Sequence, residues 1–212
     1  MPSGVSAIVL AAGAGSRFGG GKLLAKLGDR PLIEATLENL RDAPVDEVIV
    51  VVGAERLREV CDRYGARTIE NEEWERGLST SVLAGLRACG EGTRAAVVLL
   101  GDQPFVGSGA VERLVAAFEE GTKIAAATYA GERRNPVLFS RETWPLLEAE
   151  LVGDEGARSV LRRHSDLVVE VPCDGVGDPA DVDTREDLRR LQEMHGSVGG
   201  YKMGGRSIKD RN

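Results

Sequence analysis

The chain contains the stretch Leu10-Ala11-Ala12-Gly13-Ala14-Gly15-Ser16-Arg17-Phe18-Gly19-Gly20-Gly21-Lys22, which runs directly out of the apolar segment Val5–Ala11. Glycines let backbone N–H groups approach an anion without a Cβ in the way. Arg17 and Lys22 add two cations to a chain whose formal net charge is −7. The stretch therefore indicates either a phosphate-binding loop or a strand-to-helix turn that simply needs glycine.

Two common phosphate-binding patterns fail on this loop. The Walker pattern would place Ser16 at its first glycine and Leu23 at its hydroxyl position. The dinucleotide fingerprint G-x-G-x-x-G, started at Gly13, would place Phe18 at its last glycine. The second expected strand also ends at Gly53 without a carboxylate for a ribose hydroxyl. Both the Walker and the dinucleotide interpretations are therefore disfavoured.

Apolar runs alternate with amphipathic segments along the chain. The expected strands are Val5–Ala11, Glu47–Val52, Ala95–Leu100, Lys123–Thr128, Pro136–Phe139 and Leu167–Val171. The expected helices are Pro31–Arg41 (proline first), Ala54–Tyr64, Ser79–Ala88 (serine cap), Gly109–Glu119, Arg141–Leu151, Glu155–His164 and Thr184–Met194. This alternation predicts an α/β fold whose mostly parallel sheet carries right-handed helical crossovers. Trp74 and Trp144 are expected to be packing residues.

Length and charge limit the domain organisation and the partners. A chain of 212 residues with 42% apolar residues fits one large domain. We expect that domain over residues 1–195, followed by a Gly-rich, basic tail over 196–212 that we expect to be mobile. The net charge of −7 argues against nucleic acid as a partner.

The cysteines and the N-terminal segment bear on the cellular location. Cys61, Cys89 and Cys173 are odd in number and form no C-x-x-C pair, so reduced thiols are expected. The apolar run Val5–Ala12 is too short for a membrane span or a signal sequence. We therefore expect a cytoplasmic protein without a membrane partner.

The loop resembles the signature L-A-A-G-x-x-S-R-x-G, followed by Lys-Leu-Leu, of the MobA-like nucleotidyltransferases, and within them most closely the molybdenum cofactor cytidylyltransferases. Four later segments agree with family motifs in order: Gly101-Asp102-Gln103-Pro104, Asn135-Pro136-Val137-Leu138-Phe139, Gly153-Asp154-Glu155-Gly156-Ala157-Arg158 and Asp181-Val182-Asp183-Thr184. Together with the loop they extend over nearly the whole chain except the tail. The resemblance implies a three-layer α/β/α, Rossmann-like nucleotidyltransferase fold and an enzyme that transfers a nucleotidyl group.

Two aspartates are candidate ligands of Mg²⁺, the cofactor that the resemblance implies. Asp102 follows the carboxyl end of an apolar strand, where open α/β sheets bind ligands. Mg²⁺ prefers one or two carboxylates together with phosphate oxygens. Asp102 could instead cap a following helix, and Asp183, the second candidate, also fits a helix N-cap before Arg185. Asp181 is a weaker candidate.

The resemblance places the nucleotide triphosphate on the glycine-rich loop. The implied nucleotide-binding residues are Leu10, Ala11, Ala12, Gly13, Ala14, Gly15, Ser16, Ser79 and Ser81, and the implied catalytic residues are Arg17, Lys22 and Asp102. Ser79 and Ser81 could equally cap their helix and do nothing else. Ala12 stands where guanylyl-transferring relatives tend to have glycine, which favours CTP.

The acceptor that the resemblance implies is a phosphorylated pterin, the phosphate of molybdopterin, with a molybdoenzyme as a further partner that receives the cofactor. Asn135, Pro136, Asp154 and Arg158 would face this acceptor. Without the resemblance the first pair would be a turn and the second an exposed helix start. The family often has glycine before the asparagine, whereas this chain has Arg134.

Three other functions stay open on the sequence. The chain could be another nucleotidyltransferase of the same fold, transferring guanylyl groups or acting on sugar or polyol phosphates. It could be a carrier or maturation protein that binds a pterin cofactor without catalysis. It could also be a nicotinamide-dependent oxidoreductase, although the failed dinucleotide fingerprint counts against this.

Overall fold

The computed structural model describes residues 3–53 and 56–196, and within them one seven-stranded sheet has the order β5-β4-β1-β6-β8-β7-β9. The strands are β1 (Val5–Ala11), β2 (Lys26–Leu27), β3 (Arg30–Pro31), β4 (Glu47–Val52), β5 (Arg67–Glu70), β6 (Ala95–Leu100), β7 (Ile124–Tyr129), β8 (Glu132–Ser140) and β9 (Val168–Pro172). Strand β8 runs antiparallel to both of its neighbours, and every other pair in this sheet is parallel. Strands β2 and β3 form a separate short ribbon.

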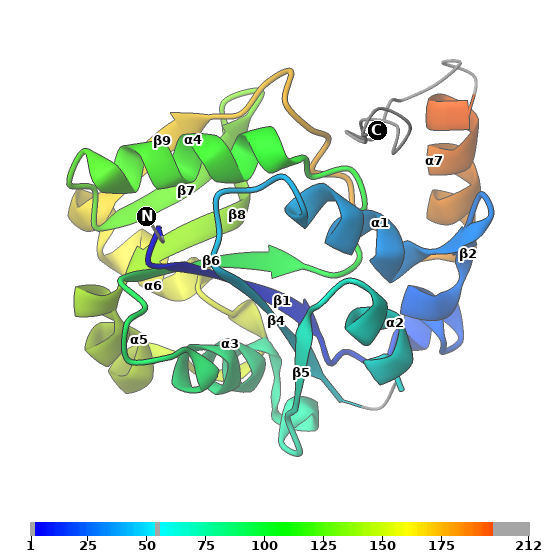
Figure 1. Ribbon diagram of the computed structural model, residues 1–212, viewed down its shortest axis with the longest axis horizontal. Helices are drawn as coiled ribbons and strands as arrows, with labels where there is room; N and C mark the ends of the chain where they lie inside the picture. The colour runs from blue at the N-terminus through cyan, green and yellow to red at the C-terminus, as the bar shows by residue number, and fades with distance from the viewer. Residues whose placement is uncertain (1–2, 54–55, 197–212) are drawn as a thin grey trace, which may run out of the picture.

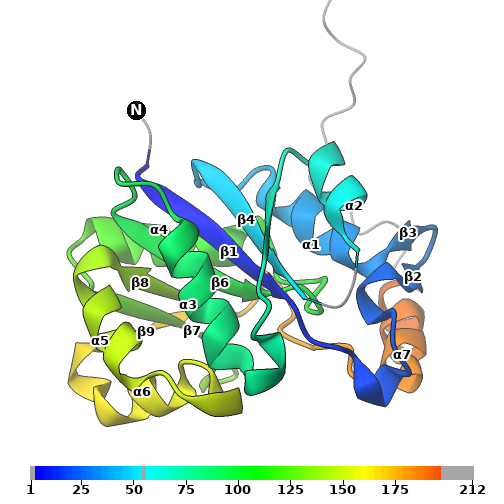
Figure 2. The same cartoon turned by 90° about the horizontal axis from the view of Figure 1, so that it is seen from below.

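Helices cover both faces of the sheet (Figures 1 and 2). They are α1 (Leu32–Leu40), α2 (Arg58–Arg63), α3 (Leu78–Ala88), α4 (Ser108–Glu119), α5 (Trp144–Glu150), α6 (Arg158–Arg163) and α7 (Arg185–Gly196). Figure 1 shows α1, α2 and α4 on one side of the sheet and α3, α5 and α6 on the other. The central strand β1 is buried on both faces and sends Ala7 and Val9 into one core and Ile8 and Leu10 into the other. The predicted three-layer α/β/α fold is confirmed.

Three of the expected strands, β1, β4 and β6, have the predicted bounds. Strand β8 is longer than the expected Pro136–Phe139, because its first residues are polar and exposed and carry no apolar signal. Strand β5 was not predicted at all. It is a short edge strand with charged residues at both ends, so the apolar run that marks a buried strand is missing.

The helices depart from the predictions mainly at their N-termini. Helix α1 begins at Leu32 with Pro31 as its N-cap, one residue later than expected. The N-cap of α3 is Gly77 and not a serine, and no side chain donates or accepts a cap hydrogen bond there. The expected start of α5 is a 3₁₀ turn, Arg141–Thr143, and Glu155, the expected first residue of α6, is the last residue of another, Gly153–Glu155. A 3₁₀ turn at a helix end is common, and sequence periodicity does not distinguish it from the α-helix.

Some predictions fall on residues outside the described part of the chain. The expected helix from Ala54 begins at residues 54–55, which are not described, and α2 is helical only from Arg58. Apart from Gly196, which ends α7, the expected tail also lies outside the described residues. None of the described helices combines the length and the apolar character that a membrane span needs.

The three cysteines are unpaired, and we expect Cys61 and Cys89 to react very slowly with iodoacetamide in the folded protein. Burial raises the pKa of the Cys61 and Cys89 thiols to about 11, so at pH 8 only about one in a thousand of either is the reactive thiolate. Mass spectrometry after alkylation, with a urea-unfolded sample as the control, measures this. Rapid stoichiometric labelling of Cys61 without unfolding would contradict the burial described.

Candidate functional site

The glycine-rich loop folds back on the carbonyl oxygen of Gly15. This oxygen accepts hydrogen bonds from the N–H groups of Phe18, Gly19 and Gly20 at 2.9, 3.1 and 3.1 Å. Gly15 has φ 59°, and a Cβ built on it would lie 3.0 Å from the Cβ of Lys22. Phe18 is buried and anchors the loop in the core. Glycine is thus needed at residue 15 for both the turn and the close approach of Lys22.

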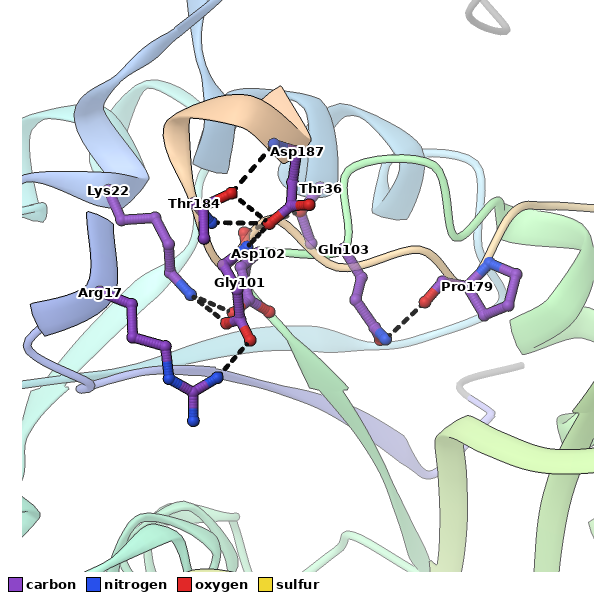
Figure 3. A network of polar contacts seen from close by, with 10 residues as sticks. Arg17, Lys22, Thr36, Gly101, Asp102, Gln103, Pro179, Thr184 and Asp187 are labelled. Atoms are coloured by element: carbon purple, nitrogen blue, oxygen red, sulfur yellow. Dashed lines mark hydrogen bonds and ion pairs between the residues drawn. The ribbon is translucent and has the colours of Figure 1, made fainter. Parts of the chain in front are cut away.

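Lys22 lies at the centre of an ionic cluster (Figure 3). Its ammonium nitrogen is 2.6 Å from Oδ2 of Asp102 and 3.6 Å from Oδ1 of Asp183. Arg17 completes the cluster with a guanidinium nitrogen 2.8 Å from Oδ2 of Asp183. The Lys22 side chain is only 13% exposed and that of Arg17 is 78% exposed, so Lys22 is the better shielded cation. Two cations and two carboxylates therefore meet beside the loop.

Asp102 follows the carboxyl end of β6 and is fixed by its backbone. Its carbonyl oxygen accepts the N–H of Val182, and the N–H of Gly101 donates to Leu10 at the end of β1. Burial raises the pKa of the Asp102 carboxyl above its ordinary value, while the neighbouring Lys22 lowers it. Oδ2 is paired with Lys22, but Oδ1 is buried and has no hydrogen-bond partner. A buried, unpaired carboxylate oxygen is costly unless a ligand or ion satisfies it.

Asp183 is held by the first turn of α7. Thr184, and not Asp183, caps the helix: its Oγ1 accepts the N–H of Asp187 at 3.1 Å. Oδ2 of Asp187 in turn accepts the N–H of Thr184 at 2.8 Å and that of Asp183 at 3.3 Å. This reciprocal capping leaves the Asp183 carboxylate free to face Arg17 and Lys22.

We expect Asp187→Asn to lower the free energy of unfolding by about 1 kcal/mol at neutral pH, since it weakens this cap. Hydrogen bonding, first of all from the Thr184 side chain, lowers the pKa of Asp187 below its ordinary value of 3.8. A lowered carboxyl pKa stabilises the fold above the unfolded-state pKa, and the contribution is lost as the pH falls through the folded-state pKa. The difference between wild type and Asp187→Asn should therefore shrink as the pH falls below 3.8. Urea unfolding from pH 7 to pH 3 tests this, with exposed Glu186→Gln as the matched control; a pH-independent difference would contradict it.

A cavity of about 580 Å³ lies over the loop and the ionic cluster. Its lining includes Leu10, Ala11, Ala12, Gly13, Ala14, Gly15, Ser16, Arg17, Lys22, Ser81, Asp102, Asp154, Arg158, Asp181 and Asp183. The carboxyl ends of β1 and β6, which are neighbours in the sheet, open into it. The site therefore lies at the sheet edge where α/β proteins bind ligands.

The wall opposite the loop is formed where α3 meets the segment 153–156. Gly77 has φ 114°, and a Cβ on it would lie 2.5 Å from the carbonyl carbon of Gly153 and 2.7 Å from Oδ1 of Asp154. Glycine at residue 77 thus permits this close approach. Trp74 and Leu78 line the cavity beside it.

A second cavity, of about 300 Å³, adjoins the first. Leu100, Arg158 and Asp181 line both of them. The remaining residues of the second cavity are Gln103, Arg133, Arg134, Asn135, Val137, Leu161 and Arg162. Arg158 thus stands between two spaces, one over the glycine-rich loop and one beside β8 and α6.

The structure brings most of the sequence-predicted site residues together. All the predicted loop residues, both metal candidates, Ser81, Asp154 and Arg158 line the larger cavity, and Asn135 and Arg158 line the smaller one. Asp154, predicted for the acceptor, lines the larger cavity only. Ser79 and Pro136 line neither cavity and are buried.

The two serines differ because of the helix they share. Ser79 is 2% exposed and its hydroxyl has no partner, whereas Ser81 reaches the cavity and accepts a hydrogen bond from Asn71 at 2.9 Å. Residues two apart on an α-helix point about 200° apart, so they cannot face the same ligand. The amide nitrogen of Asn71 donates hydrogen bonds to the hydroxyls of Thr80 and Ser81, each at 2.9 Å.

Several lining residues were missed from the sequence. Trp74 and Trp144 both pack in or against the core as expected, but Trp74 also lines the larger cavity. Three residues that line the smaller cavity were also not predicted as site residues, namely Gln103, Arg133 and Arg162. Gln103 could have been found because it directly follows Asp102 in a motif segment. The others belong to the site through the packing of distant segments, which leaves no local pattern.

The described chain is thus a nucleotide-binding-type α/β domain, with a glycine-rich loop, paired cations and carboxylates at the carboxyl edge of its sheet. The model of the MobA-like NTP transferase domain matches residues 7–168, and the chain belongs to this family. The family assignment from the motifs is therefore confirmed, and the chain is an NTP transferase of the MobA-like family.

Two curated relatives cover nearly the whole chain. A nicotine blue oxidoreductase of Paenarthrobacter nicotinovorans is 33% identical over 198 residues, which are 88% of this chain and 96% of that protein. A probable molybdenum cofactor guanylyltransferase of Thermococcus kodakarensis is 31% identical over 195 residues, 88% and 93% of the two chains. These names differ in activity, so they leave the nucleotide base and the acceptor open.

Two crystal structures are similar to this chain in both sequence and fold. The Rv0371c homologue from Mycobacterium sp. strain JC1 has a TM-score of 0.79 at 31% identity, covering 93% of this chain and 100% of that chain. Rv0371c of Mycobacterium tuberculosis in complex with manganese has a TM-score of 0.73 at 30% identity, covering 89% and 98%. A structural neighbour therefore binds a divalent metal.

Proposed function

We propose that the chain transfers a cytidylyl group from CTP to the phosphate of molybdopterin, with Mg²⁺ as cofactor and pyrophosphate as the leaving group. The observation that carries this proposal is the meeting of the glycine-rich loop, Lys22 and Asp102 in one cavity that adjoins a second, arginine-lined cavity. Two adjoining spaces suit a reaction between a nucleotide and a separate acceptor. Membership of the MobA-like family supports the same reaction class.

The carboxylates fit a magnesium ion. Within residues 3–53 and 56–196, no three His, Cys, Asp or Glu side chains are grouped so that they could hold a metal by themselves. Mg²⁺ needs only one or two carboxylates when substrate phosphates complete its shell. Oδ1 of Asp102, buried and unpaired, would supply one such ligand, and Asp183, whose Oδ1 lies 3.6 Å from the ammonium of Lys22, would supply another. The chemistry that the ion supplies is neutralisation of phosphate charge as pyrophosphate departs.

The residues of the chain would act by positioning and by charge. Backbone N–H groups of the loop and the cations Lys22 and Arg17 hold the triphosphate, and Arg158 lies where the acceptor phosphate meets it. A phosphate oxygen of the acceptor attacks the α-phosphorus of CTP. The bond between the α-phosphorus and the oxygen that bridges to the β-phosphorus breaks, and pyrophosphate leaves. The acceptor phosphate is already ionised near neutrality, so the transfer needs no strong general base.

The choice of CTP rests on Ala12. It directly follows β1, is 4% exposed and is one of the residues that line the larger cavity, so the residue type at this position bears on the base that the cavity accepts. The guanylyltransferase among the relatives makes GTP the natural competitor. We expect CTP to be used at least about tenfold more efficiently than GTP, a difference of about 1.4 kcal/mol in transition-state binding.

A pyrophosphate-release assay with molybdopterin and CTP, GTP or ATP tests the proposal. Release with CTP and Mg²⁺ supports it, and a preference for GTP would make the protein a guanylyltransferase instead. Binding of CTP without product would favour a carrier protein. A titration with NADPH covers the oxidoreductase alternative, which one relative's name raises; saturable binding of NADPH without nucleotidyl transfer would overturn the proposal.

A further inference from the structure

The smaller cavity differs from the larger one in charge. Four arginines line it, Arg133, Arg134, Arg158 and Arg162, against a single carboxylate, Asp181. The larger cavity has several carboxylates in its lining, namely Glu75, Asp102, Asp154, Asp181 and Asp183. In a chain with net charge −7, this concentration of arginines is a local feature and not a general basic surface. The smaller cavity is therefore suited to an anionic ligand.

Arg134 and Arg162 line only the smaller cavity, away from the loop and its cations. Each already has a carboxylate: Arg134 lies 2.7 Å from Glu132, and Arg162 lies 2.6 Å from Glu155. All four side chains are more than half exposed, so these ion pairs contribute little to stability. A guanidinium has five N–H donors, which lets it bind a ligand while keeping or exchanging such a partner.

Arg133 has a different role in the same cavity. It pairs with Glu170 of β9 at 2.6 Å and donates to the carbonyl oxygen of Leu161. These contacts join β8 to β9 and to α6. Arg133 therefore holds β8, β9 and α6 together at this cavity, whereas Arg134 and Arg162 each have further guanidinium N–H groups that can bind a ligand.

Gln103 contributes a buried amide group to the lining of the smaller cavity. It is 5% exposed, and its amide nitrogen donates to the carbonyl oxygen of Pro179 at 2.8 Å (Figure 3). This bond fixes the amide, and the other end, Oε1, is buried without a partner. A buried amide oxygen normally accepts a hydrogen bond, so a ligand in this cavity would supply an N–H or O–H group.

We propose that the acceptor carries a second anionic group, besides the phosphate that is nucleotidylated, and that Arg134 and Arg162 bind it. This inference rests on the proposed function, because it assigns the smaller cavity to the acceptor. Arg158, shared by both cavities, faces the reacting phosphate, and Gln103 receives a hydrogen-bond donor of the acceptor's body. The substrate class is therefore a phosphomonoester with a second anion and at least one N–H or O–H group.

Two small phosphomonoesters that differ in one carboxylate test the proposal. The probes are 3-phosphoglycerate and glycerol 3-phosphate, titrated by calorimetry with Mg²⁺ and with the larger cavity filled by a CTP analogue whose α,β-bridging oxygen is replaced by methylene. Wild type should bind 3-phosphoglycerate at least about tenfold more tightly. Arg134→Gln and Arg162→Gln should each reduce this preference, and the double variant should abolish it.

Arg163→Gln is the matched control. Arg163 follows Arg162 on α6, is similarly exposed and pairs with Glu150, but it does not line either cavity. Its loss should leave the probe preference unchanged, and Arg→Lys at residues 134 and 162 should restore part of it. Equal or undetectable binding of the two probes to wild type, or a preference that survives in the double variant, would overturn the inference.

The failure of this inference can be told apart from failure of the proposed function. The probe titration requires no turnover, so a carboxylate preference that depends on Arg134 and Arg162 supports the inference by itself. Absence of pyrophosphate release from CTP and molybdopterin would contradict cytidylyl transfer alone. Thermal unfolding of every variant confirms that a lost preference does not come from a lost fold.

Discussion

Asp102→Asn is expected to lower kcat/KM for nucleotidyl transfer by at least about a thousandfold, a loss of about 4 kcal/mol of transition-state stabilisation. The amide has the shape of the carboxylate but no charge. It would be a poor ligand for Mg²⁺ and would leave Lys22 without the negative charge that now lies 2.6 Å away. Because Asp102 is proposed to act on charge that develops on the phosphates, kcat should fall more than CTP binding.

The fold should survive this substitution. The backbone hydrogen bonds of Gly101 and Asp102 do not involve the carboxylate. Burial raises the pKa of Asp102, which means that folding disfavours its charged form, and the amide removes that cost at neutral pH. We therefore expect a midpoint of thermal unfolding close to that of wild type.

The assay for Asp102→Asn is pyrophosphate release from CTP and molybdopterin at saturating Mg²⁺, paired with thermal unfolding. Asp29→Asn, at a side chain that is 93% exposed, is the control for removing an aspartate charge. Activity within tenfold of wild type in this assay would show that Asp102 is not the metal ligand. Loss of both activity and fold would instead contradict the backbone argument above.

The sequence predicted the parts of the site that are local in the chain. The loop Leu10–Lys22 and the aspartates after β6 and before α7 carry their chemistry in consecutive residues, and strands of a parallel sheet bring such segments to one edge. The central strands were found for the same reason. Strands buried on both faces are continuous apolar runs, which composition alone reveals.

What the sequence missed depends on contacts between distant segments. Trp74 lines the larger cavity beside the point where α3 and the segment 153–156 meet at Gly77, and no local pattern encodes that meeting. Arg162 reaches the smaller cavity only because α6 packs beside β8. Ser79 does not line the cavity that Ser81 reaches, and helical periodicity already places these two side chains about 200° apart.

Lys22→Ala is expected to weaken binding of CTP with Mg²⁺ by roughly a hundredfold, which is about 2.7 kcal/mol. Lys22 is the shielded cation of the cluster, and charge-assisted hydrogen bonds to phosphate are strong where water is partly excluded. Its removal also leaves Asp102 and Asp183 with the exposed Arg17 as the remaining cation of the ionic cluster. Arg17→Ala should therefore cost less than about tenfold in the same titration.

The pattern of losses in Lys22→Ala distinguishes a triphosphate-binding residue from a merely structural one. The KM for molybdopterin should change much less than the Kd for CTP, because Lys22 does not line the smaller cavity. Lys26→Ala is the matched control, since Lys26 is an exposed lysine close in the chain that lines neither cavity. Equal losses for CTP and for the acceptor would mean that Lys22 supports the site as a whole. A selective loss for CTP would tie the glycine-rich loop to the triphosphate, because Lys22 is positioned by the close approach at Gly15.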